Sequence, residues 1–309
     1  MEKLGNLLVY EWNSWRGYLI SHLAGAHCAA QWDDDWTVLE AACGPGIDTV
    51  LFHHCLSHAA LFPRQRPAFE RELARRGIRV LNAGLADMRK RTLHGMLDRA
   101  GLRSARAARQ GPDDQFLFIK TDLNYGGKAE RALPAELQPL FSAAADCPIR
   151  GWDDYRLMRR DEVEPGWWDN PDLVIENFIA HDDTLYRVYG CGDALVCIRA
   201  HSPDLIKKED ERPEDTWVYI DRRQLTPAIG DHGGFPRDLW RQLAGFVAQY
   251  PFDYFCLDVI HDGIRHTIID LNLTPFYAPH PPKAGWFAFL RRGLRELTAG
   301  RPTLMEVAR

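Results

Sequence analysis

Two apolar runs near the C-terminus, separated by an Asp-Gly pair, carry acidic side chains where a buried strand normally has none. The stretch FCLDVIHDGIRHTIIDLNLTP predicts a β-hairpin over 254–271 that turns around Asp262-Gly263. Asp258 lies in the first run, and Asp270 and Asn272 lie two residues apart on one face of the second. Buried carboxylates need a cation, and oxygen ligands suit Mg²⁺ when phosphates complete its shell. The alternative is an acidic strand end in a solvated hairpin.

The turn of this hairpin decides whether the three oxygen ligands can meet. With a two-residue turn, Asp258 would oppose Thr267, and Asp270 would emerge from the other face of the sheet. One extra loop residue, with Gly263 in the left-handed conformation of a G1 bulge, returns Asp258 to the face of Asp270 and Asn272. We therefore expect a bulge at Gly263.

A second polar signal follows the apolar run 116–119. Lys120 ends this run and leads into a loop that contains Gly126 and Gly127. A lysine at a strand end can bind phosphate through its charge, and glycines let backbone amides approach an anion closely. The loop lacks the GxxxxGK[ST] pattern of a Walker A motif, and an ordinary hairpin turn is the alternative interpretation.

A third signal is the stretch VIENFIAHDDTLYRVYG, in which an apolar strand carries Glu176 and leads to an acidic pair. At such a junction the backbone of Phe178 and Ile179 can meet an adenine edge, and an acidic side chain can bind ribose hydroxyls. Taken alone, the stretch is also compatible with an amphipathic edge strand.

Composition limits the class of protein. With 309 residues, 46% of them hydrophobic and 26% charged, the chain is expected to form two or three compact units of a soluble globular protein. The net charge of -5 gives no long-range attraction to nucleic acid or to an anionic membrane. The seven scattered cysteines form no CxxC pair and are expected to be reduced thiols. The chain has no apolar signal sequence and no run near the ~18 residues of a membrane span, so we expect a cytoplasmic protein.

Periodicity predicts a mixed α/β (α+β) chain. Strands are expected at 7–10, 38–42, 49–52, 78–81, 116–119, 173–179, 185–189, 194–199, 254–260 and 266–271. Helices are expected at 67–76, from 86 to a stop at Gly101, at 236–249, and at 286–298, where a surface helix carries arginines on one face.

In this order and spacing, the three signals resemble the ATP-grasp superfamily, which includes D-alanine–D-alanine ligase, glutathione synthetase and ribosomal-protein glutamate ligases. The resemblance covers roughly 86–275 and ends on Asp-Leu-Asn-Leu-Thr-Pro at 270–275. It implies an N-terminal α/β domain over 1–85, followed by subdomains over 86–172 and 173–309 that clasp ATP. It implies ATP contacts from Lys90, Lys120, Gly126, Gly127, Glu176, Phe178, Ile179 and Asp183, with Arg91 and Asp182 as second choices, and Mg²⁺ ligands Asp258, Asp270 and Asn272.

The same resemblance gives Arg187 and Arg199 to the reacting groups, where fixed cations would stabilise the transferred phosphoryl group. Their alternative role is an ordinary salt bridge. The reaction implied is the activation of a small carboxylate as an acyl phosphate and its capture by an amine, with release of ADP and phosphate. A phosphotransferase on the same fold and an inactive ATP-binding protein are the alternatives, and a homodimer is left open.

Two other parts of the sequence suggest different chemistry. The stretch VLEAACGPGIDTV over 38–50 resembles the first glycine motif of S-adenosylmethionine-dependent methyltransferases, but no following strand ends in an acidic residue that would bind ribose. His53, His54 and His58 have no carboxylate close in sequence to orient them for metal binding, so structural or substrate-shaping roles are expected.

Overall fold

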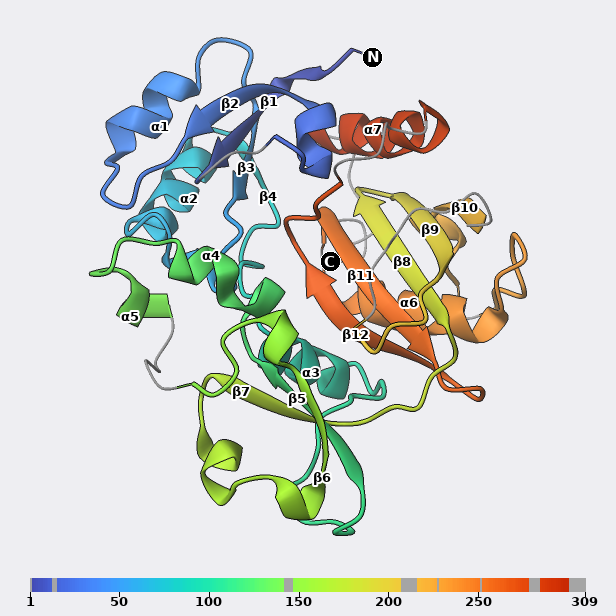
Figure 1. The fold of residues 1–309 in the computed structure, drawn as a ribbon. Coiled ribbons are helices and arrows are strands. Elements are labelled where there is room, and N and C mark those ends of the chain that lie inside the picture. The colour runs from blue at the N-terminus through green and yellow to red at the C-terminus, as the bar shows by residue number, and fades with distance from the viewer. Residues whose placement is uncertain are drawn as a thin grey trace.

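The computed structural model describes residues 2–12, 16–141, 147–206, 216–226, 228–250, 252–277 and 284–299. Three β-sheets organise these residues (Figure 1), so the mixed α/β class expected from the sequence is confirmed. Within the described ranges, no helix is long and apolar enough to cross a membrane. All seven cysteines are free thiols.

The N-terminal sheet is parallel, in the order β2-β1-β3-β4. Helices α1 and α2 connect its strands, as the right-handed crossover of parallel strands requires. The elements are β1 Leu4–Glu11, β2 Ala24–Ala29, α1 Trp36–Ala42, β3 Thr49–His53, α2 Arg66–Arg75 and β4 Arg79–Leu81.

Helix α1 corrects the strand expected at 38–42. The Asp35 carboxylate caps this helix by accepting a hydrogen bond from the Thr37 amide at 2.9 Å, and an N-cap of this kind favours a helix over a strand. The glycines Gly44 and Gly46 therefore follow a helix and precede a strand. A nucleotide-binding glycine motif requires the reverse order, so the methyltransferase interpretation loses its structural basis.

The middle sheet is antiparallel, in the order β6-β5-β7. β7, which begins at the boundary expected at 173, pairs with β5 from Thr121–Leu173 to Leu117–Asn177. The elements here are α3 Lys90–Arg99, β5 Phe116–Thr121, α4 Lys128–Arg131, α5 Gln138–Phe141, β6 Arg156–Arg159 and β7 Leu173–Asn177.

The third sheet is antiparallel, in the order β10-β9-β8-β11-β12. One of its faces packs on α3 and α6 through a core that includes Leu239, Trp240 and Phe246. Its elements are β8 Thr184–Cys191, β9 Ala194–His201, β10 Thr216–Asp221, α6 Arg237–Gln249, β11 Tyr254–His261, β12 His266–Asn272 and α7 Ala284–Thr298. Short 3₁₀ turns lie at Leu19–His22, Ala59–Leu61, Asn124–Gly127, Trp152–Asp154, Arg160–Glu162, Pro165–Asp169 and Arg222–Gln224.

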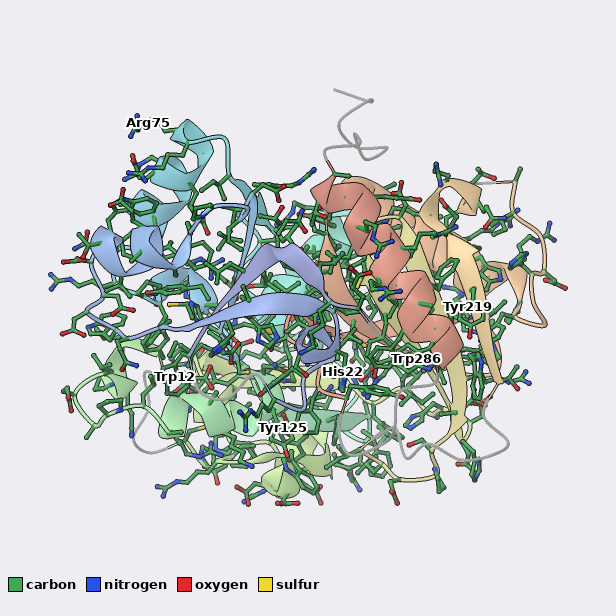
Figure 2. All side chains as sticks on the ribbon, turned by 90° about the horizontal axis from the view of Figure 1, so that it is seen from above. Trp12, His22, Arg75, Tyr125, Tyr219 and Trp286 are labelled. Carbon is green, nitrogen blue, oxygen red and sulfur yellow. The ribbon has the colours of Figure 1, made fainter. Side chains whose placement is uncertain are left out.

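Helix α7 does more than cover the surface, which corrects the expected surface helix. Its apolar side chains Trp286, Phe287 and Leu290 are buried in one core with residues of β1 and of β8. Figure 2 shows α7 lying between the N-terminal and C-terminal sheets, with Trp286 beneath it. The helix therefore joins the two sheets, and the part of the third sheet that it leaves uncovered forms a wall of the site.

Candidate active site

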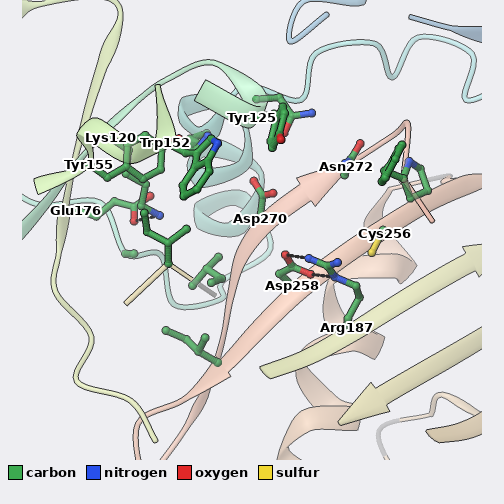
Figure 3. A pocket seen from close by; sticks show the side chains of 18 of the residues that line it. Lys120, Tyr125, Trp152, Tyr155, Glu176, Arg187, Cys256, Asp258, Asp270 and Asn272 are labelled. Carbon is green, nitrogen blue, oxygen red and sulfur yellow. Dashed lines mark hydrogen bonds and ion pairs between the residues drawn. The ribbon is translucent and has the colours of Figure 1, made fainter. Parts of the chain in front are cut away.

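A cavity of about 780 Å³ opens where the three sheets meet. Figure 3 shows Lys120, Trp152, Tyr155 and Glu176 gathered on one side, Asp270 in the middle, and Arg187, Cys256 and Asn272 on the other side. Nine of the residues expected at a site line this cavity: Lys90, Lys120, Glu176, Phe178, Ile179, Arg187, Asp258, Asp270 and Asn272.

Lys120 and Glu176 form a buried ion pair on adjacent strands. Lys120 Nζ lies 2.6 Å from Glu176 Oε2, and both side chains are under 10% exposed. His94 Nε2 lies 3.1 Å from the other oxygen of Glu176, and His94 Nδ1 lies 2.8 Å from Ser104 Oγ. Burial alone raises the pKa of Glu176, but Lys120 and His94 outweigh it and lower the pKa to about 2. The lysine is therefore held in one position, with its charge largely compensated.

Lys90 reaches the same end of the cavity from the start of α3. Its Nζ donates a hydrogen bond to the Leu123 carbonyl at 2.8 Å and lies 6.0 Å from the centre of the Tyr155 ring. Burial lowers the pKa of Lys90, but nearby groups, including Tyr155 and Asp270, outweigh it and raise the pKa overall. Lys90 therefore stays charged in a buried place, as a phosphate-binding lysine must.

The three expected oxygen ligands emerge from one sheet face, although not in the way the sequence predicted. Asp258 pairs directly with Asp270, and Cys256 pairs with Asn272. The turn holds four residues between His261 and His266, and the extra residue sits inside β12, where the register shifts beside Asp258. Gly263 has the expected positive φ of 88°, but the bulge itself is not at Gly263.

Arg187 binds one of these carboxylates. Its Nε and Nη2 donate to the two oxygens of Asp258 at 2.7 and 2.8 Å, a bidentate pair between neighbouring strands. Asp270 faces Asp258 across the hairpin, and burial together with the Asp258 charge raises the pKa of Asp270 against the effect of Lys90. A face-to-face carboxylate pair with an amide oxygen beside it is the donor set that Mg²⁺ prefers, so these residues fit that ion.

The segment around Phe178 and Ile179 supplies side chains to the cavity, while part of its backbone already makes hydrogen bonds within the protein. The Phe178 amide donates to the Phe116 carbonyl at 3.1 Å, and the Ile179 carbonyl lies 2.6 Å from His181 Nδ1. The side chains of Phe178 and Ile179 still line the cavity. An adenine edge would therefore meet apolar side chains here and would need backbone groups other than these two.

The glycine loop folds as a tight left-handed turn. Tyr125, Gly126 and Gly127 have φ values of 46°, 65° and 74°, and α4 begins at Lys128. A Cβ atom on Gly126 would lie 2.6 Å from the Trp152 backbone nitrogen. The two glycines do not line the cavity themselves, but Tyr125 and Lys128 do. The glycines are therefore needed for the path of the loop.

Besides Gly126 and Gly127, two more of the expected site residues do not line the cavity. Arg199 pairs with Tyr186 on the face of the sheet opposite to Asp258, and its guanidinium lies 5.8 Å from the centre of the Phe235 ring. Successive side chains of a strand point to opposite faces of the sheet. Arg199 pairs with Tyr186, the residue before Arg187, so Arg199 points away from the cavity that Arg187 lines. Asp183 is exposed and does not line the cavity.

Solved structures show the same fold over nearly the whole chain. D-alanyl-alanine synthetase A from Vibrio cholerae matches with a TM-score of 0.52 at 11% identity, covering 97% of this chain and 98% of that one. D-alanine–D-alanine ligase from Bacillus anthracis matches with a TM-score of 0.50 at 12% identity, covering 95% and 96%. This chain therefore has the ATP-grasp fold that the sequence leads us to expect.

Sequence relatives of this chain carry other names. A protein named inositol-tetrakisphosphate 1-kinase 4 from Oryza sativa is 30% identical over 172 residues, which are 50% of this chain and 46% of the relative. A protein named inositol-tetrakisphosphate 1-kinase 3 from Glycine max is 31% identical over 127 residues, or 36% and 35%. The match therefore spans less than half the length of these relatives. No family model matches the chain.

Several residues in and beside the cavity could not be predicted from the sequence. Trp152 and Tyr155 line the cavity from a short 3₁₀ turn and the residue after it. His94, which contacts Glu176 but does not line the cavity, lies in an amphipathic helix. Tyr18 and Cys55 come from the N-terminal unit, outside the range that resembles ATP-grasp proteins, and the Cys55 thiol donates to the Tyr18 hydroxyl at 2.8 Å. No local sequence pattern identifies such residues, because the fold brings them together from segments that are distant in the sequence.

The expected structural role of the histidines agrees with their surroundings. His53 is fully buried and hydrogen-bonded to Glu11 of the neighbouring parallel strand, a carboxylate that is distant in sequence. His54 is also buried, and burial lowers its pKa well below the usual value. Among the residues that the structure describes, no group of three or more His, Cys, Asp or Glu side chains could hold a metal.

Proposed function

We propose that this protein is an ATP-dependent carboxylate–amine ligase that forms ADP. The observation that carries the proposal is the convergence of two kinds of group on one cavity. Lys90 and Lys120 supply fixed cations at one end, and Asp258, Asp270 and Asn272 supply oxygen ligands at the middle and beyond. This arrangement suits a nucleotide triphosphate whose terminal phosphate points toward Arg187.

The proposed reaction has two steps. A carboxylate oxygen of the substrate attacks the γ-phosphorus of ATP, the bond between that phosphorus and the β–γ bridging oxygen breaks, and ADP leaves. The amine nitrogen then attacks the acyl carbon, the acyl carbon–oxygen bond breaks, and phosphate and one proton are released. Lys120 and Lys90 hold the phosphates, and Arg187 lies beside the charge that develops on the transferred group.

Asp258, Asp270 and Asn272 would hold Mg²⁺, which neutralises phosphate charge when it is bound. The raised pKa of Asp270 supports this assignment, because a cation would relieve the repulsion between the two facing carboxylates. Arg187 meanwhile keeps the Asp258 carboxylate aligned by its two hydrogen bonds.

The acyl phosphate must be shielded from water until the amine arrives. We assign that shielding to the segment 122–128, because Tyr125 and Lys128 line the cavity and Tyr125 is 58% exposed at its rim. A ring at this position can cover the reacting groups when the loop moves inward.

The kinase names of the sequence relatives favour a phosphotransferase as the second candidate. The charges of the cavity argue against a highly phosphorylated acceptor. Its described lining holds four cations, Lys90, Lys120, Lys128 and Arg187, against three anions, Glu176, Asp258 and Asp270. A polyphosphate beside ATP would need many more paired cations than this set provides.

Isotope transfer distinguishes the two reactions. With a carboxylate substrate labelled with ¹⁸O, a ligase places label in the released inorganic phosphate, whereas a kinase gives a stable phosphorylated product. Label found only in AMP would mean adenylation and would overturn the proposal.

Two arginines provide a matched test of the site geometry. Arg187→Ala should reduce ADP formation by about 100-fold or more, because it removes the cation at the reacting phosphate. Arg199→Ala should leave ADP formation within about threefold, because Arg199 is exposed on the other face of the sheet. The reverse pattern would show that the assigned reaction site is wrong.

A further inference from the structure

The end of the cavity beyond the oxygen ligands has walls of a distinct chemical kind. Along β8 and β11, Arg187 pairs with Asp258, and the next inward-facing pair is Tyr189 with Cys256. Two residues along a strand span about 7 Å. A carboxylate held beside Arg187 therefore has its attached group against a tyrosine ring and a thiol.

Aromatic side chains continue this wall into the N-terminal unit. The Tyr18 and Phe276 rings meet edge to face at 5.3 Å between centroids, and their backbones form an isolated β-bridge. Tyr277 lies next to Phe276 and also lines the cavity, as does Cys55, whose thiol donates to the Tyr18 hydroxyl. We call Tyr18, Cys55, Tyr189, Cys256, Phe276 and Tyr277 the aryl wall.

The aryl wall contains no ionised group. The burial of Cys55 raises the pKa of its thiol to about 12, and burial also raises the pKa of Tyr18. Phe276 is 54% exposed, although a large apolar side chain is normally buried. Tyr189, Cys256 and Tyr277 are under 10% exposed, so Phe276 is the ring of the aryl wall with the most surface left for a ligand to cover.

We propose that the carboxylate substrate carries an aromatic ring, which packs against the aryl wall while its carboxylate lies beside Arg187. This proposal rests on the ligase function proposed above and assigns the class of acid that the ligase activates. The span between Arg187 and Tyr189 fits a ring two or three bonds away from the carboxylate. A ring also makes edge-to-face contacts with Tyr18 and Phe276 that an aliphatic chain cannot make.

Hydroxylamine makes the test independent of the natural amine, because it captures an acyl phosphate as a hydroxamate. With ATP, Mg²⁺ and hydroxylamine, 3-phenylpropionate and phenylalanine should give kcat/KM values at least about 10-fold above those of propionate and alanine. Equal or better activity with propionate, alanine or glutamate would overturn the aryl assignment and leave the ligase function standing.

Substitutions then locate the ring. Phe276→Ala should raise KM for 3-phenylpropionate about 10-fold and leave KM for ATP unchanged, and Phe276→Leu should restore part of the loss. Tyr219→Ala is the matched control, because Tyr219 is an exposed ring beside α7, packed on Phe289. An unchanged KM for 3-phenylpropionate in Phe276→Ala contradicts the proposal.

Binding without turnover separates this inference from the ligase proposal. If no acid gives hydroxamate, the ligase function fails, and calorimetry with 3-phenylpropionate and a non-hydrolysable ATP analogue still tests the wall. Binding that is at least about 10-fold weaker in Phe276→Ala supports the aryl wall, and no binding to the unchanged protein refutes it.

Discussion

At the scale of single residues, the Lys120–Glu176 pair combines a structural and a functional role. Both side chains are buried, so removing the ammonium leaves a buried carboxylate that has lost its ion-pair partner and keeps its hydrogen bond with His94. We expect Lys120→Ala to lower the free energy of unfolding by about 3–5 kcal/mol, as for other broken buried ion pairs. Lys128→Ala, an exposed lysine at the same cavity, should change it by less than about 0.5 kcal/mol. Urea unfolding at neutral pH measures both.

A double variant separates the two roles of Lys120. Lys120→Ala with Glu176→Gln removes the unpaired charge, so stability should return in part. The thermal shift produced by ATP should stay lost, because the phosphate-binding cation is absent. Recovery of that shift in the double variant would show that Lys120 does not bind the nucleotide.

The depressed pKa of Glu176 also predicts a pH dependence of stability. The folded-state pKa is about 2 and the ordinary value is 4.5, so ionised Glu176 stabilises the fold above pH 4.5. This contribution is lost as the pH falls from 4.5 toward 2. Glu176→Gln should therefore show a shallower loss of unfolding free energy across this range. If the unfolding free energy fell equally with pH in the unchanged protein and in Glu176→Gln, the ion pair would be contradicted.

The pKa of Asp270 is shifted in the opposite direction to that of Glu176. Burial and Asp258 raise its pKa, so the ionised side chain destabilises the metal-free fold. Asp270→Asn should raise the melting temperature without Mg²⁺ and reduce ADP formation by about 100-fold or more. A melting temperature that falls without Mg²⁺ would argue that Asp270 has a structural partner instead.

At the scale of elements, what the sequence could predict depended on whether a signal was local. The hairpin strands and the αL glycine after α3 follow from local periodicity and turn chemistry, and they appear as expected. The face of Arg199 depends on how β9 pairs with β8, which no local pattern fixes. The position of the bulge beside Asp258 likewise depends on packing of the whole sheet.

The left-handed turn before α4 gives a prediction for an element. Gly126→Ala places a Cβ 2.6 Å from the Trp152 backbone nitrogen and keeps an unfavourable positive φ. We expect it to destabilise the fold by at least about 1 kcal/mol and to weaken ATP binding by shifting the loop. Gly263→Ala is the matched control, because its φ is also positive but no atom lies within 4 Å of the new Cβ. Equal effects on ATP binding would show that the loop is not part of the site.

At the scale of the whole molecule, the cavity exists because three sheets are held in a fixed relation. One apolar core contains residues of the N-terminal sheet, of the five-stranded sheet and of α7. Two units that share a core gain stability from each other, so they are expected to unfold together. The N-terminal unit carries Tyr18 and Cys55 to the cavity, which makes this docking a requirement for the site.

A glycine in α7 tests this docking. A Cβ on Gly293 would overlap the Cys191 carbonyl oxygen and lie 2.5 Å from the Ala194 side chain, so Gly293→Ala must push α7 away from the sheet. We expect Gly293→Ala to lower the free energy of unfolding by about 1–3 kcal/mol, as overpacking does, despite the higher helix propensity of alanine.

Gly95→Ala in α3 is the control, because its Cβ would meet Arg99 at an ordinary 3.5 Å. That variant should gain up to about 1 kcal/mol from helix propensity alone. Calorimetry should show a single transition for the unchanged protein, shifted downward in Gly293→Ala and upward in Gly95→Ala. Two separate transitions in the unchanged protein would mean that the N-terminal unit unfolds on its own and that α7 does not couple the sheets. The substrate end of the cavity would then depend on an independent docking step.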